Sequence, residues 1–388
     1  MKRIRAGFLV GSMSENWLGG LNYFRNLFAA LGEWPERTVE PVLVLGRKAG
    51  EKHYRDFARF ELVRTPCLDR LHPAWFLRHS LLKIFGRDLV LGAVLKKKRV
   101  DIQSHAPAIA GSPIPIATWL ADFQHVYFAK FFSPKDLRAR ELSFRRTVRF
   151  SDAIILSSHD AEKDLAAYAP AAVKKSYVLH FVASPPSVEN VPSQDVLAGK
   201  HQIQGPYFHL PNQFWSHKNH QVVVEALLLL KQRGCAAQVL ATGNTKDGRQ
   251  PGFFETLMES VRTAGVEERF RVLGLVPYAD LVGLMENSVA LINPSLFEGW
   301  STTVEEAKSL GKRVLLSNLA VHREQNPDGG VYFDPANPVE LADRMAEVLS
   351  DRQFDSAALK AKAALEFPAR RREFAVEYCR MIEKIVSG

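Results

Sequence analysis

The chain of 388 residues has only 3 cysteines, Cys67, Cys235 and Cys379, and they lie far apart. Such an odd, sparse set excludes a disulfide-stapled fold, contains no paired metal ligands and is typical of a reducing compartment. Long apolar runs are also missing: the longest near a helix, 226–230, is far short of the about 18 residues that span a membrane. The apolar run 8–10 is too short for a signal-peptide core, so we expect a cytoplasmic protein.

The overall composition is that of a folded protein in water. Hydrophobic residues make up 46% of the chain and charged residues 24%, which excludes a disordered chain and a fibrous repeat. The length exceeds what one hydrophobic core supports and fits two domains of ordinary size.

Positive charge is concentrated in the first half. Residues 1–200 hold 30 Lys and Arg against 19 Asp and Glu, a net of +11, whereas 201–388 hold 21 against 23, a net of −2. The excess lies mainly in 52–149, which indicates an anionic partner such as membrane phospholipid, a phosphorylated lipid carrier or nucleic acid. A solvated basic face without a partner is the alternative.

Apolar patterns predict strands that alternate with helices. In the first half we expect strands at 4–10, 39–45, 101–103, 114–120, 153–157 and 177–181, with helices near 21–31, 74–98, 134–149 and 159–168. In the second half we expect strands at 207–210, 238–241, 271–276, 289–293 and 313–316, with helices at 219–232, 253–264, 279–287 and 302–310. Pro, Ser and Gly make 182–206 a linker. The pattern predicts two doubly wound, Rossmann-like α/β domains whose ligand cleft faces the carboxyl ends of the strands.

Glycines follow the first predicted strand. Gly11, Gly19 and Gly20 precede a helix, where backbone N–H groups can approach an oxygen-rich anion. The segment has neither the GxGxxG fingerprint nor a P-loop pattern. An ordinary strand-to-helix turn is the alternative interpretation.

The most specific stretch is 293–312. A strand ends there, a loop carries Glu298 and Gly299, and a helix opens near Thr302 and Thr303, whose first-turn amides suit a phosphate. Glu306 follows about one turn into the helix, so two glutamates with seven residues between them can address two ends of one ligand.

This stretch resembles the retaining glycosyltransferases of family 4, which have the GT-B fold of two Rossmann-like domains. Their pattern E-G-F-G-L-P-x-x-E-A compares with EGWSTTVEEA at 298–307. The resemblance implies that Glu298 holds the transferred sugar's hydroxyls, that Glu306 holds the nucleotide ribose, and that the backbone of 299–303 meets the diphosphate. The departures from the family's small and proline residues are Trp300, Ser301, Thr302 and Thr303.

A second match is 207–227, where the family has an Arg, then a Lys five residues later, both neutralising the leaving diphosphate. Lys218 falls on the Lys position, while Gln213 replaces the Arg and can donate only a neutral hydrogen bond. His217 and His220 are interpreted as surface polarity around a helix start. A metal site is disfavoured, because no Cys, Asp or Glu ligands accompany this His-x-x-His.

A third match is 119–125, at a strand end of the first domain. The resemblance implies that His125 lies over the donor sugar and leaving group, and we assign Asp122 to positioning. Ser158 and His159 lie in a similar strand-to-helix segment, where a helix cap explains Ser158 equally well. Ser104 and His105 follow a strand and are candidates for the acceptor side.

The resemblance implies transfer with retention, without a bound metal, by front-side attack. The donor would be a GDP- or UDP-linked sugar, with a mild preference for mannose, and the acceptor a glycan or lipid-linked molecule of cell-surface polysaccharide synthesis. The predicted domains are 1–185, the acceptor side, and 200–369, the nucleotide-sugar side, with 370–388 packing back on the first.

Residues 68–100 interleave aromatic and basic residues, which suits peripheral contact with an anionic membrane at its inner face, although an apolar face packed on the domain's own sheet is the alternative. Nucleic acid is disfavoured, since no nucleic-acid-binding module is evident. Two other functions remain open: a nucleotide-sugar epimerase on the same fold, and a non-catalytic subunit that binds a nucleotide or glycan.

Overall fold

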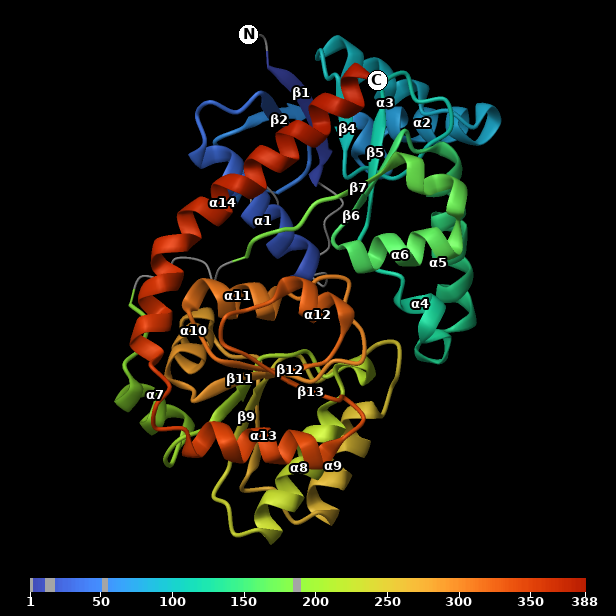
Figure 1. Cartoon of the computed structure of the whole chain (residues 1–388). Coiled ribbons are helices and arrows are strands. Elements are labelled where there is room, and N and C mark those ends of the chain that lie inside the picture. Colours follow the sequence, from blue (N-terminus) through green and yellow to red (C-terminus); the bar gives the residue numbers. More distant parts are fainter. Residues whose placement is uncertain (1–2, 11–17, 51–54, 184–189) are drawn as a thin grey trace. The chain divides into compact units, whose positions relative to one another are not determined.

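The computed structural model describes residues 3–10, 18–50, 55–183 and 190–388 (Figure 1). Internal contacts divide the chain into two units. Unit 1 comprises Met1–Phe123, Pro134–Val182 and Pro368–Gly388, and unit 2 comprises Gln124–Ser133 and Ala183–Phe367. The chain therefore leaves unit 1 and returns to it twice. Compared with the expected boundary at 185, the short segment 124–133 groups with unit 2.

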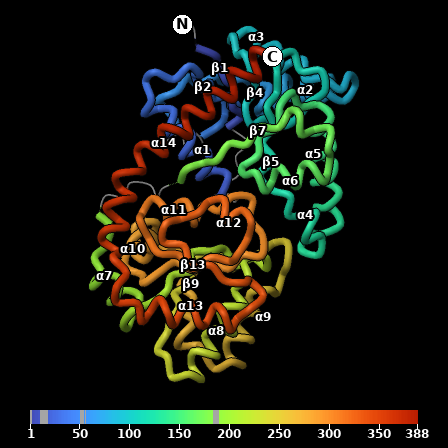
Figure 2. Tube along the Cα trace, in the orientation of Figure 1, coloured from blue at the N-terminus to red at the C-terminus, as the bar shows by residue number. Residues whose placement is uncertain are grey.

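Unit 1 is built on a parallel sheet of the order β3-β2-β1-β4-β5-β6-β7. Its strands are β1 (Ile4–Leu9), β2 (Val39–Leu45), β3 (Glu61–Arg64), β4 (Ile102–Ser104), β5 (Ile116–Leu120), β6 (Ala153–Leu156) and β7 (Ser176–Val178). Its helices are α1 (Leu18–Glu33), α2 (Pro73–Phe85), α3 (Leu89–Lys97), α5 (Pro134–Phe150), α6 (His159–Tyr168) and the second part of α14 (Ser356–Ser387). In Figure 2 the last residues of the chain, in red, return to the neighbourhood of the first strands, where Tyr378 packs against Phe8.

Unit 2 is built on a parallel sheet of the order β10-β9-β8-β11-β12-β13. Its strands are β8 (Phe208–Leu210), β9 (Val239–Thr242), β10 (Phe270–Gly274), β11 (Ala290–Asn293), β12 (Val314–Ser317) and β13 (Gly330–Phe333). Its helices are α4 (Gln124–Tyr127), α7 (Gln194–His201), α8 (His220–Gln232), α9 (Phe253–Thr263), α10 (Tyr278–Asn287), α11 (Thr302–Leu310), α12 (Ala320–Gln325), α13 (Pro338–Ser350) and the first part of α14.

The central strands of unit 2 are largely apolar on both faces, and helices cover both faces of the sheet. Every residue of β8, β9, β11 and β12 is buried, as expected for parallel strands between two helical layers. One apolar cluster joins the sheet to α8, α9 and α13, and another joins it to α10 and α11. The doubly wound α/β fold predicted from the sequence is therefore confirmed in both units.

Local differences from the predicted elements have local causes. The helix expected over 74–98 is two helices, because Gly86 ends α2 in the left-handed conformation and Asp88 caps α3 through its bond from Leu91 N. The linker 182–206 contains α7, whose first turn is capped by Ser193. In the described part of the chain, no helix combines the length and the apolar character needed to cross a bilayer.

Candidate functional site

The sheet order of unit 2 marks one crevice. Strand β8 pairs with β9 on one side and with β11 on the other, so the direction of winding reverses between β8 and β11. Ligands of doubly wound sheets bind at this switch point, at the carboxyl ends of the strands. The loop after β8 carries Gln213 and Lys218, and the loop after β11 carries Glu298. The fold thus brings the two most specific sequence motifs to one place.

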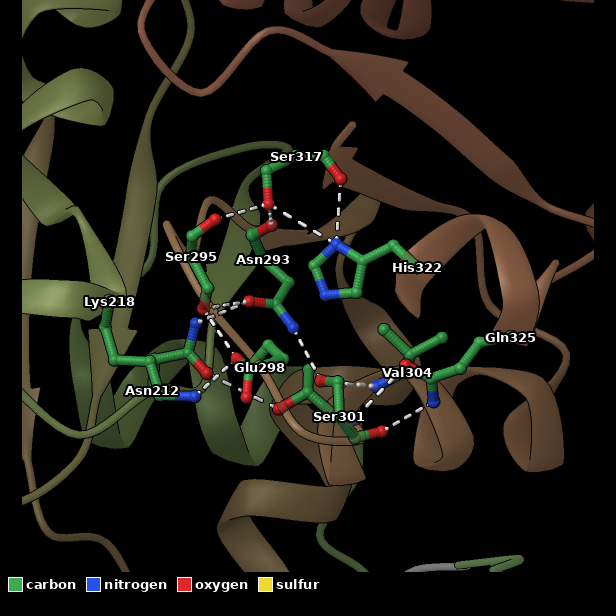
Figure 3. Close-up of polar contacts among 11 residues, drawn as sticks. Asn212, Lys218, Asn293, Ser295, Glu298, Ser301, Val304, Ser317, His322 and Gln325 are labelled. Carbon is green, nitrogen blue, oxygen red and sulfur yellow. Dashed lines mark hydrogen bonds and ion pairs between the residues drawn. The ribbon is translucent and has the colours of Figure 1, made fainter. Parts of the chain in front are cut away.

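An ion pair lies at this switch point (Figure 3). Lys218 Nζ is 2.5 Å from Glu298 Oε1, and the two side chains are only 14% and 10% exposed. Burial alone would raise the pKa of Glu298, but Lys218, His322 and the hydroxyl of Ser295 together hold it below its ordinary value. Glu298 is therefore a carboxylate at neutral pH, with its charge balanced by one lysine.

A buried amide network surrounds the ion pair (Figure 3). Ser295 Oγ lies 2.6 Å from Glu298 Oε1 and 2.8 Å from Asn293 Oδ1, so these two acceptors share its proton. Asn293 Nδ2 donates to Ser301 Oγ at 2.7 Å. Asn212, after β8, donates to Asn293 and accepts from Thr303, each at 3.4 Å. These bonds tie the ends of β8 and β11 to the start of α11.

The start of α11 is held by two side chains. Ser301 is the helix cap, since its Oγ accepts from Val304 N. Gln325 of α12 accepts from Ser301 N at 3.1 Å and donates to Ser301 O at 3.0 Å and to Glu305 Oε1 at 3.1 Å. The amino-terminal end of this helix is therefore fixed where an anion would gain from its dipole and first-turn N–H groups.

The two predicted glutamates have different electrostatic environments. Glu306 lies in α11 and is 8% exposed, and burial raises its pKa to about 7. Glu298, paired with Lys218, is shifted in the opposite direction. Near neutral pH Glu298 is therefore ionised, whereas Glu306 is in part protonated. The spacing of the two residues in the sequence does not predict this difference.

A second layer supports the Glu298 loop from β12 and α12. Ser317 Oγ donates to Ser295 O at 2.6 Å, and His322 Nδ1 lies 2.8 Å from Ser317 O, to which it donates (Figure 3). Burial lowers the pKa of His322, so its ring is neutral at neutral pH. Five of these residues were not predicted from the sequence as part of the site: Asn212, Asn293, Ser317, His322 and Gln325. Three of these end or follow buried strands, a position at which polar residues could have been sought.

Gln213 is engaged with a neighbouring loop. Its Oε1 accepts from Asn244 N at 2.9 Å, directly after Gly243. Gly243 has φ +148°, and a Cβ there would clash with the backbone oxygen of Asn212. The close approach of these two loops fixes the Gln213 amide after the carboxyl end of β8.

The interpretation of His217 and His220 as surface polarity is wrong, because both are buried. His220 stacks on Phe214 with ring centroids 4.4 Å apart. Burial, with a smaller effect of Lys218, lowers the pKa of His220 to about 3. Its ring is thus a neutral part of the core beneath Lys218.

His125 lies in α4, buried, in the segment that groups with unit 2. Beside it, Arg249 Nη1 donates to Gln124 Oε1 at 3.4 Å, and the rings of Tyr127 and Phe297 are 5.6 Å apart. Phe297 directly precedes Glu298, so this segment borders the Glu298 loop. Asp122 belongs to unit 1, where it pairs with Arg140 at 3.3 Å.

The remaining predicted residues fall into four groups. Gly299, Trp300 and Thr302 are half-buried between the ion pair and the start of α11. Gly19 and Gly20 lie in the first turn of α1 rather than before it, and Gly11 lies outside the described residues. Ser158 caps α6 by accepting from Ala161 N at 3.0 Å, which is the helix-cap interpretation of this residue. Ser104 is fully buried in the core of unit 1 beside His105.

Comparison with protein families gives a match to the second unit. Residues 200–365, within unit 2, match the family Glycosyl transferases group 1. No curated protein sequence matches the chain.

Solved structures share the fold of the whole chain. Alr3699/HepE of Anabaena, solved with UDP and glucose, is 16% identical with a TM-score of 0.69 over 100% of both chains. A glycosyltransferase of Rickettsia africae ESF-5 is 16% identical with a TM-score of 0.68 over 99% of this chain and 100% of that one. A UDP-N-acetylglucosamine 2-epimerase is 14% identical with a TM-score of 0.50 over 93% and 91%. The two Rossmann-like units thus have the fold of GT-B glycosyltransferases.

Proposed function

We propose that this protein is a retaining glycosyltransferase of family 4 that transfers a sugar from a nucleoside-diphosphate donor. The observation that carries the proposal is the Lys218–Glu298 pair at the β8/β11 switch point, beside the capped start of α11. This arrangement offers one cation and a helix start to a diphosphate, and one carboxylate to sugar hydroxyls. The family match over residues 200–365 supports it.

In the proposed reaction each residue has a distinct role. Lys218 neutralises the leaving diphosphate together with the backbone N–H groups of 299–303, while Gln213 adds a neutral hydrogen bond. Glu298 accepts from hydroxyls of the transferred sugar, and Glu306 accepts from the ribose. His125 contacts the donor sugar and leaving group. The acceptor attacks from the face that the diphosphate leaves, and the departing phosphate takes its proton; stabilising the developing charge is the main catalytic contribution.

We propose that the donor is UDP- or GDP-linked and that the reaction needs no metal. Alr3699/HepE, with the same fold, was solved with UDP-glucose, which supports a UDP-linked donor, whereas the mild preference for mannose comes from the family resemblance. The proposed acceptor is a glycan or a lipid-linked molecule of cell-surface polysaccharide synthesis, used at the inner face of the membrane.

The first test is thermal stabilisation by UDP, GDP, ADP, CMP and TDP, each with and without EDTA. A ligand that binds only the folded protein raises its melting temperature. One nucleotide that stabilises the protein equally with EDTA would identify the donor base and support the metal-free reaction. No shift with any nucleotide would contradict the proposed site and favour a non-catalytic subunit.

Product analysis then separates transfer from epimerisation, since an epimerase shares the fold. Incubation with the sugar nucleotide alone, followed by chromatography of the sugar, would reveal an epimerised donor. Transfer requires that product forms only when an acceptor is present. Retention further requires that the anomeric configuration, read by NMR, is unchanged.

A further inference from the structure

Helix α2 of unit 1 (Pro73–Phe85) contains no buried residue, although most of its sequence is apolar. Phe76, Leu77, Ile84 and Phe85 are 50%, 54%, 71% and 59% exposed, and Leu71, just before the helix, is 71% exposed. Its neighbour α3 behaves differently, because Leu91 and Leu95 enter the core of the unit. The two sequence alternatives for 68–100 therefore apply mainly to different helices: α3 packs on the unit, and α2 leaves several large apolar side chains in solvent.

Three of the exposed apolar residues, Phe76, Leu77 and Ile84, share one side of α2. Leu77 and Ile84 are two helical turns apart, which places them in one row, with Phe76 beside them. Ala74 and Arg78 lie on the side facing the unit: Ala74 packs against the core that contains Leu91 and Leu95, and Arg78 forms an ion pair with Asp88 at 2.6 Å. The row is thus directed away from the unit.

The charge around this row has one sign. Residues 70–99 contain 8 Lys and Arg and a single acid, Asp88. Asp88 is buried, paired with Arg78 and used as the cap of α3, so it contributes no negative charge to the surface. The other basic residues are all exposed, and none forms an ion pair with a residue in the described ranges: Arg70, Lys83, Arg87, Lys96, Lys97, Lys98 and Arg99.

We propose that this surface, the exposed side of α2 with the basic residues of 70–99, docks on an anionic phospholipid bilayer. Aliphatic and aromatic side chains of a short helix enter the boundary between headgroups and acyl chains, while surrounding lysines and arginines meet lipid phosphates. A second copy of the chain is disfavoured, since pairing two such surfaces would bring like charges together. Nucleic acid would use the basic residues but offers nothing to Leu77 and Ile84.

This inference goes beyond the proposed activity, because it concerns a surface of unit 1 and holds for any function of the crevice in unit 2. Its test is co-sedimentation of the full chain with phosphatidylcholine vesicles that contain or lack phosphatidylglycerol. We expect sedimentation only with phosphatidylglycerol, weakening as salt is raised.

Two pairs of substitutions address the two components. Phe76→Ser with Ile84→Ser removes apolar contacts, and Lys83→Glu with Lys97→Glu removes charge; each pair should weaken the apparent affinity at least about tenfold. Leu275→Ser with Leu365→Ser is the matched control, since these side chains are 69% and 82% exposed in unit 2. All positions are exposed, so the variants should fold, which stabilisation by the nucleotide of the first test would verify.

Three results would overturn the proposal: equal sedimentation with neutral vesicles, wild-type sedimentation of both double variants of this surface, or a dimer by sedimentation velocity that these double variants dissociate. Each leaves the nucleotide shift of the wild type intact, so failure of the membrane surface is distinguishable from failure of the proposed function.

Discussion

The two units have the same strand order around their switch points, yet the side chains gathered there differ in kind. In unit 2 the β8/β11 crevice contains an ion pair, amides and hydroxyls. In unit 1, among the described residues, the β1/β4 position is filled by rings. Tyr23 stacks on Trp119 with centroids 4.2 Å apart, and Phe8 stacks on His105 at 5.7 Å. Topology thus locates a possible crevice, and side chains decide whether it is packed or equipped for a ligand.

Polar groups in unit 1 serve its packing. His105 Nε2 lies 2.7 Å from the hydroxyl of Tyr23, and its Nδ1 lies 2.8 Å from Ser104 Oγ. Tyr378 donates to the same Ser104 hydroxyl at 3.0 Å. Burial lowers the pKa of His105 to about 3, so it stays neutral and satisfied. The prediction that Ser104 and His105 face an acceptor finds no support in this arrangement.

The largest effect should follow from removing the cation of the unit 2 crevice. Lys218→Ala should lower kcat by at least about a hundredfold, roughly 3 kcal/mol, because the diphosphate loses its main counter-charge. Initial rates of sugar transfer measure this, with exposed Lys246→Ala as the matched control. A loss of tenfold or less, with the fold intact, would remove Lys218 from the mechanism.

The complementary change is in unit 1. His105→Ala should lower the free energy of unfolding by about 2 kcal/mol or more, since it opens a cavity and leaves Tyr23 and Ser104 short of a partner. His105 also has φ +55°, which alanine adopts less readily, so His105→Gly should recover part of the loss. Urea unfolding measures both. Nucleotide affinity should stay at the wild-type value, and a matching fall would mean that His105 reaches the ligand.

Glu306 gives the unit 2 crevice a pH dependence. If its carboxylate accepts ribose hydroxyls, nucleotide affinity should rise by up to about tenfold between about pH 5.5 and pH 8, as the group with a pKa of about 7 loses its proton. Glu306→Gln should make affinity flat over this range. Isothermal titration at several pH values tests this, and an equally steep profile in the variant would exclude Glu306.

The same pKa fixes the sign of a stability effect. Between the ordinary glutamate pKa and about 7, the folded protein holds a proton that the unfolded chain has released. Stability should therefore fall as pH rises through this window, and Glu306→Gln should reduce that fall.

The smallest expected effect is at Gln213. Gln213→Arg restores the cation of the family pattern but loses the bond from Asn244 N. We expect nucleotide affinity to increase less than about fivefold and its salt dependence to become steeper, because a second cation meets the diphosphate. Affinity measured at two salt concentrations tests this. Gln213→Lys is the matched comparison, because lysine adds the charge without the planar guanidinium of arginine. An unchanged salt dependence in both variants would show that residue 213 does not contact the diphosphate.

The sequence predicts best those residues that lie close to one another along the chain. Glu298, Ser301 and Glu306 lie in one strand-to-helix segment, so their spacing alone places them together. Strand alternation likewise predicts the sheets, because burial on both faces requires continuous apolar runs.

Hydrogen-bond partners that are far apart along the chain could not be predicted from motif spacing. Gln325 reaches Ser301 across 24 residues, and Asn212 reaches Asn293 across 81. The burial of His217 and His220 was also not predicted. Two histidines at a helix start do not reveal which side chains bury them, as Phe214 does for His220. The raised pKa of Glu306 depends on its surroundings and has no signature in the motif.

The division of the chain has a consequence for its synthesis on the ribosome. Unit 1 contains the early strands β1 to β7 but takes Tyr378, Phe374 and Ile382, all buried, from α14. Its sheet is translated early, yet its aromatic core cannot close until the segment 374–382 has been made. Unit 2 ends at Phe367, so it can fold before unit 1. During that time the sheet of unit 1 still lacks the side chains that α14 adds to its core.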